Sequence, residues 1–129
     1  MISYSKARKD AYQLFVDCAN EIDVKVFDCI PNTNVSKGAI FEIRYTGTPI
    51  TPIDGISTQL NVLQCTLTVF SFESWEVTEQ ICDQLATLSG KGDKNTFQMI
   101  ILKSNYYMDF IEAEGFFAIQ MDFDIILRQ

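Results

Sequence analysis

The chain contains no histidine, so its reactive groups are carboxylates, thiols, hydroxyls and a few cations. Histidine is the most frequent general base, the usual partner of a serine or cysteine nucleophile, and the most frequent metal ligand. Its absence removes the arrangements on which most hydrolases depend. We therefore expect no enzymatic activity, no cofactor, and no catalytic or metal-binding residues.

Two carboxylates, those of Asp122 and Asp124, stand two residues apart in a stretch where apolar and polar residues alternate. In a strand this spacing places both side chains on one face, where a carboxylate pair can share a proton or bind a divalent cation. The same strand face adds only Gln120 and Arg128, without a third acidic ligand. We interpret the pair as part of a solvated face.

Two other polar segments match known binding motifs only superficially. Asp109, Glu112 and Glu114 lie near a turn, but they lack the ordered oxygen spacing of a calcium loop. The glycines and lysines of 90–94 follow an expected helix and precede an expected strand, which is the reverse of the order in a phosphate-binding loop. Neither segment predicts a ligand site.

The four cysteines, Cys18, Cys29, Cys65 and Cys82, form no CxxC pair. Three of them fall on or beside apolar positions, where cysteine behaves as a small hydrophobic residue. The segment that starts at Met1 soon turns polar, unlike a secretory signal. We expect four free thiols in a protein made in the cytoplasm, and no cysteine nucleophile.

The formal net charge is −7, and the main basic cluster is Lys6, Arg8 and Lys9. A protein that binds DNA or RNA tightly needs several cations directed at phosphates, so such binding is not expected. No apolar run is long enough to span a membrane. Basic residues near a helix start oppose the helix dipole. An acidic partner would explain them, and so would chance.

Apolar periodicity divides the chain into helices and strands. Ser74 is placed to cap a second helix and Gly90 to end it. The expected order is a helix over 5–22, strands over 24–27, 39–46 and 57–72, a helix over 74–90, and strands over 97–102, 106–112 and 117–127. Because the strand over 57–72 is unusually long, either it bends or its first part projects beyond the sheet, as in a protruding hairpin over 45–60.

These elements predict one α+β domain that spans all 129 residues. We expect an antiparallel or mixed sheet with two helices packed on one face. Apolar residues make up 47% of the chain and charged residues 21%, as in an ordinary globular protein.

Aromatic residues at neighbouring strand positions point in opposite directions, so some of them must face away from the core. Such residues need either a second covering layer or an interface between subunits, and we favour the interface. A loop over 47–56 carries three isoleucines and either folds over the core or contacts a partner. The expected contact residues are Ile50, Ile53, Ile56, Phe70, Phe72, Tyr106 and Phe116.

The central segment of the chain resembles that of tail-terminator and tail-completion proteins of long-tailed bacteriophages, which include the minor tail protein U type and head-to-tail joining proteins. Those small proteins also open with a helix, have a short strand near a proline, and end in a strand pair. The residues that carry the resemblance are Asn61-Val-Leu-Gln-Cys-Thr-Leu-Thr-Val-Phe-Ser71 running through 72–74 into a helix, Val26-Phe-Asp-Cys-Ile-Pro31, and the segments 107–109, 114–117 and 122–125.

The resemblance implies a structural protein of the virion, assembled in the host cytoplasm. Such a protein forms a homo-oligomeric ring, usually a hexamer, which caps the finished tail tube, stops its polymerisation and docks to the head connector or head-completion protein. DNA only passes through the channel, which Asp122 and Asp124 are expected to line. No membrane is involved.

Two alternatives remain open. Another neck or tail-tube-related protein of a phage would share the α+β fold that the resemblance implies. A small-ligand-binding or regulatory α+β domain is an alternative of a different class, in which Trp75 and the aromatic cluster would line a pocket.

Overall fold

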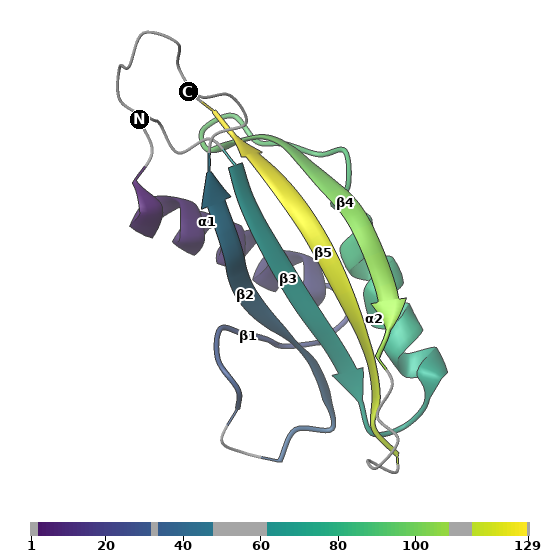
Figure 1. Ribbon diagram of the computed structural model, residues 1–129. Coiled ribbons are helices and arrows are strands. Elements are labelled where there is room, and N and C mark those ends of the chain that lie inside the picture. Colours follow the sequence, from purple (N-terminus) through teal and green to yellow (C-terminus); the bar gives the residue numbers. More distant parts are fainter. Residues whose placement is uncertain (1–2, 32–33, 48–61, 109–114, 129) are drawn as a thin grey trace, which may run out of the picture.

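A five-stranded sheet and two helices form the described part of the chain, residues 3–31, 34–47, 62–108 and 115–128 of a computed structural model (Figure 1). The fold is α+β, as the sequence predicts. In chain order the elements are α1 (Tyr4–Asn20), β1 (Val26–Phe27), β2 (Lys37–Gly47), β3 (Val62–Ser71), α2 (Trp75–Ala86), β4 (Phe97–Tyr107) and β5 (Phe117–Leu127).

The sheet has the strand order β1-β2-β3-β5-β4 and is mixed. The short β1 runs parallel to β2, and the other three neighbouring pairs are antiparallel. Both helices lie behind the sheet in Figure 1, so the described elements cover only one of its faces. We call the other side the open face.

Helix α1 is capped by Ser3 and packs its apolar side onto the covered face. The Ser3 hydroxyl accepts a hydrogen bond from the Lys6 amide at 3.2 Å. Phe15 is fully buried, and its ring centroid lies 5.1 Å from that of Phe123 on β5 and 5.8 Å from that of Phe41 on β2. This stripe forms one side of the core.

Helix α2 is capped by Ser74 as predicted, but the prediction that Gly90 ends it is wrong, because the helix ends at Ala86. The Thr87 hydroxyl donates to the Gln84 carbonyl at 2.6 Å, and the next amides bond three residues back. These bonds tighten the chain into turns before Gly90. Gly90 instead adopts a positive φ of 85° at the turn toward β4.

The prediction of separate strands over 97–102 and 106–112 is wrong for the described residues, because Phe97–Tyr107 is one strand. A bulge between Leu102 and Ser104 shifts the register, and Ser104 then pairs with Asp122 on β5. The Ser104 hydroxyl donates to that carboxylate at 3.2 Å. Ser104 therefore stays inside the strand, because Asp122 on the neighbouring strand accepts its hydrogen bond.

The strand expected over 117–127 is confirmed without change, and the described part of the long strand begins at Val62. The protruding hairpin expected over 45–60 lies largely outside the described residues. Two further sets of residues also lie outside the described part of the chain. They are the isoleucines expected to make contacts, Ile50, Ile53 and Ile56, and the acidic residues Asp109, Glu112 and Glu114.

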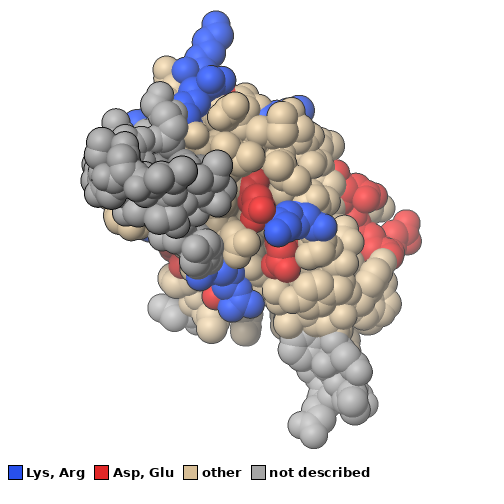
Figure 2. All heavy atoms as spheres, turned by 45° about the horizontal axis from the view of Figure 1, so that its top comes forward, with Lys and Arg blue, Asp and Glu red and all other residues tan. Residues whose placement is uncertain are grey.

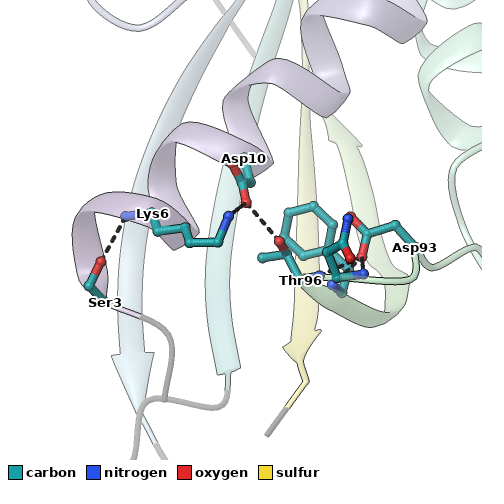
Figure 3. Close-up of polar contacts among 7 residues, drawn as sticks. Ser3, Lys6, Asp10, Asp93 and Thr96 are labelled. Atoms are coloured by element: carbon teal, nitrogen blue, oxygen red, sulfur yellow. Dashed lines mark hydrogen bonds and ion pairs between the residues drawn. The ribbon is translucent and has the colours of Figure 1, made fainter.

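Two aspartates tie α1 to the connection that precedes β4 (Figure 3). The Asp93 carboxylate accepts hydrogen bonds at 2.6 to 3.0 Å from the amides of residues 95–97. The Thr96 hydroxyl then donates to Asp10 at 2.7 Å, and Lys6 reaches the same carboxylate oxygen at 2.8 Å. This network fixes the start of α1 beside the start of β4.

No helix among the described residues combines the length and apolar character that crossing a membrane requires.

Candidate functional site

The open face of the sheet is the candidate site, because it combines a polar hollow and an apolar groove that no described helix covers. Alternation along β3 and β5 turns every second side chain toward this face. Three cross-strand pairs of β3 and β5 lie on this face. Phe70–Ala118 lies at its apolar end, and Thr66–Asp122 and Gln64–Asp124 lie in its polar middle.

The apolar groove has a volume of about 630 Å³. Its floor is formed by β2 and β3, and its sides by the chain before β2, the chain after β3 and the turn before β5. The residues that line it are Ile30, Pro31, Asn34, Val35, Ser36, Ile40, Phe70, Phe72 and Phe116.

Three phenylalanines form the aromatic part of the apolar groove. The ring centroid of Phe70 lies 6.2 Å from that of Phe72 and 6.1 Å from that of Phe116, and the last two centroids are 5.1 Å apart. Phe70 is only 5% exposed, whereas Phe72 is 54% exposed. Of the expected contact residues, Phe70 therefore forms the floor and Phe72 presents apolar surface.

Ile30 is one of the groove residues that are absent from the expected contact residues, and its side chain is 79% exposed. It lies in a segment with the composition of a loop, where no periodicity marks a side chain as buried or exposed. The residues that line the groove carry no charge. A concave, uncharged surface with exposed aromatic and aliphatic side chains is suited to an apolar partner surface.

The polar hollow has a volume of about 310 Å³ and lies beside the groove on the open face. Asp122 is its centre: its carboxylate accepts hydrogen bonds from Thr66 at 3.0 Å, and from Gln120 and Ser104 at 3.2 Å each. The Arg44 guanidinium donates to the Thr66 hydroxyl at 3.3 Å. Four neighbouring strands thus contribute to one network.

Asp124 also lies in the polar hollow, 3.5 Å from the Lys103 ammonium. Its Oδ1 atom is buried and has no hydrogen-bond partner among the described residues. Asp122 and Asp124 share the expected face, but they are half-buried beside Lys103 and Arg44, so the four formal charges cancel. The cross-strand partners were missed because the pattern of one strand does not show its neighbours.

The structure separates the remaining aromatic candidates. Tyr106 is 46% exposed and lines the polar hollow, whereas Tyr107 points to the covered face and donates a hydrogen bond to Glu79 on α2. Trp75 packs edge-on against Tyr107 and Phe117, at centroid distances of 4.9 and 5.2 Å. Trp75 therefore lines neither the hollow nor the groove, contrary to the expectation for a ligand pocket.

The thiols in the described chain are poor nucleophiles or lie apart from the open-face cavities. Burial raises the pKa of Cys82 to about 12, and burial also raises the pKa values of Cys18 and Cys65. Cys29 is exposed and lines neither cavity. Within the described residues, no three Cys, Asp or Glu side chains are grouped to hold a metal ion.

No protein-family model and no curated protein matches this chain. The described residues form an α+β fold in which two helices cover one face of the sheet. The other face carries an uncharged groove beside a polar hollow.

Proposed function

We propose that the protein is a structural component of a phage virion. Copies of it form a ring, a hexamer by the resemblance to tail-terminator proteins, that caps the tail tube, stops its polymerisation and joins the tail to the head connector. The observation that carries the proposal is the apolar groove, where Phe72 and Ile30 expose apolar surface that a neighbouring protein would cover.

A ring requires heterologous contacts, in which two different patches on each subunit meet. The groove supplies one surface for the tail tube or connector and leaves the rest of the molecule for contacts between subunits. DNA passes through without specific contacts. The net charge of −7 supports free passage better than Asp122 and Asp124 do, because Lys103 and Arg44 offset that pair.

Electron microscopy of the purified protein, alone and mixed with uncapped tail tubes, tests the proposal. We expect rings at the ends of tubes and tubes that stop growing. The Phe72→Ser variant should cap tubes about tenfold less well, because it removes an aromatic anchor from the groove. Ile22→Ser is the matched control, since Ile22 is an exposed apolar residue that does not line the groove. A protein that neither forms rings nor binds tubes contradicts the proposal.

A neck or tail-tube-related role is the nearest alternative, and the place of the rings on intact virions distinguishes it. A small-ligand-binding function is the second candidate, because the groove volume of about 630 Å³ suits a small apolar ligand. An apolar compound that raises the melting temperature of the wild type but not of Phe72→Ser would support it. A broad ligand screen without any shift would count against it.

A further inference from the structure

The start of α1 carries a basic cluster that its own chain neutralises only weakly. We call Lys6, Arg8 and Lys9 the basic turn. Lys6 pairs with Asp10 at 2.8 Å, and Arg8 lies 3.9 Å from Asp28, with all four side chains at least one-third exposed. Lys9 is exposed and pairs with none of the described residues. No acidic residue occupies the first turn of α1.

Helix α2 carries the opposite pattern. Glu76, Glu79 and Asp83 follow each other at spacings of three and four, so they lie along one side of the helix, which we call the acidic stripe. The helix contains no lysine or arginine, and no ion pair among the described residues includes the stripe. Like charges at these spacings repel, whereas the dipole of α2 favours Glu76 in its first turn, and Glu79 accepts a hydrogen bond from Tyr107.

The basic turn and the acidic stripe lie far apart on one molecule. The end of α1 meets α2 through Cys18 and Gln84, whose sulfur and carbonyl oxygen are 3.3 Å apart. Arg8 precedes Cys18 by ten residues, which is roughly 15 Å of helix. In Figure 1, α1 begins at the upper left and α2 lies at the lower right. Figure 2 shows acidic side chains at the right-hand edge, the side on which α2 lies.

We propose that the basic turn of one copy docks on the acidic stripe of the next copy, and that this contact joins subunits head to tail. The two patches have opposite charge and lie on different sides of the chain, which is what a heterologous interface needs. The basic turn opposes the dipole of α1, and Asp83 in the last turn opposes that of α2, so pairing between copies offsets a local cost at each patch. The inference rests on the proposed ring, and it names the surfaces by which copies meet.

A charge-swap series tests the interface. One variant carries Arg8→Glu and Lys9→Glu, a second carries Glu76→Lys and Asp83→Lys, and the third combines all four changes. All four native side chains are exposed, and thermal unfolding verifies that each variant folds. Sedimentation at low ionic strength and ring occupancy on tail tubes measure assembly.

We expect each two-site variant to weaken self-association about tenfold, which corresponds to two lost surface ion pairs. The combined variant should restore association, because every contact again joins opposite charges. High salt should weaken association of both the wild type and the combined variant. Lys91→Glu with Lys94→Glu is the control for the Arg8 and Lys9 variant, since it makes the same change in net charge at exposed positions outside both patches.

The outcomes separate this inference from the proposed function. Rings that form on tubes regardless of the charge swaps, or a combined variant that remains as weak as its parents, overturn the interface and leave the proposed function intact. Reversible, salt-sensitive association that responds to the swaps, without any binding to tubes, supports the interface and overturns the capping function. A wild type that is monomeric at low salt and leaves tubes bare overturns both.

Discussion

Asp93 organises the connection between α2 and β4 through a single carboxylate oxygen. That oxygen accepts the amides of residues 95–97, and Arg128 donates to the Asp93 carbonyl at 2.7 Å. Partial burial opposes ionisation of the carboxyl, but the three amide bonds and the nearby Arg128 outweigh it and hold the pKa of Asp93 below its ordinary value of 3.8.

Replacing this side chain should expose a pH-dependent contribution to stability. We expect Asp93→Ala to lower the free energy of unfolding by about 1 kcal/mol at pH 7, a figure reduced for solvent competition, with a smaller loss in Asp93→Asn. A lowered folded pKa stabilises above pH 3.8 and ceases to do so as pH falls through the folded value. Urea unfolding at pH 7 and pH 3 should therefore show a difference that shrinks in acid. A difference that grows in acid contradicts this role.

The cysteines should differ sharply in reactivity. Cys29 is exposed, whereas Cys18, Cys65 and Cys82 are buried. Because burial raises the pKa values of the buried thiols, raising the pH to about 9 should not activate them while the protein stays folded. Mass spectrometry after alkylation should find one label on the native protein and four after unfolding. Labelling of Cys65 before Cys29 would contradict the packing described above.

At the scale of the elements, the charges at the start of α1 and at the end of α2 oppose the helix dipoles. Asp83 lies in the last turn of α2, where the helix dipole favours a cation, and four residues after Glu79. We expect Asp83→Lys to stabilise the monomer by about 0.5 kcal/mol, because it adds a favourable Glu–Lys pair and relieves the dipole mismatch.

Thermal unfolding of Asp83→Lys beside Asp83→Asn separates the two causes, since asparagine removes the charge without adding a pair. If Asp83→Lys stabilises the monomer but weakens assembly, Asp83 contributes to contacts between copies and not to the stability of its own helix. A destabilised Asp83→Lys variant would show that Asp83 has a local structural role.

The edge strand β4 is protected along its first half. The Gly90 amide donates to the Ile100 carbonyl at 2.7 Å, and the Ile100 amide donates to the Lys91 carbonyl at 2.8 Å. The preceding connection therefore occupies backbone groups that another strand could pair with. For this reason we place the expected contacts on helix and groove surfaces, and not on an extension of the sheet at this edge.

At the scale of the whole molecule, aromatic residues on the two sheet faces contribute differently. Phe15 is fully enclosed on the covered face, so Phe15→Ala should lower the free energy of unfolding by about 3–5 kcal/mol. Phe72→Ser on the open face should cost about 1 kcal/mol or less, because more than half of the side chain is already in contact with water. Chemical denaturation of both variants measures the contrast. Equal losses would show that the groove belongs to the structural core.

The α+β class and most elements follow from the sequence, because apolar periodicity and capping residues act over a few positions. The alternation that ends at Leu127 predicts β5 in full, and Ser74 marks the start of α2. The burial of Cys18, Cys65 and Cys82 follows from the same periodicity. The composition alone also excludes chemistry that depends on a histidine side chain.

The tertiary structure decided the features that depend on neighbours distant in the chain. Ser104 stays within β4 because Asp122 on another strand accepts its hydrogen bond. Trp75 packs beneath Tyr107, and Ile30 reaches the groove, through contacts that local periodicity does not encode. Thus the sequence by itself determined that the chain forms two helices and a sheet without histidine chemistry. Only strand order, register and long-range packing decided which side chains meet on the open face, because those contacts join residues dozens of positions apart.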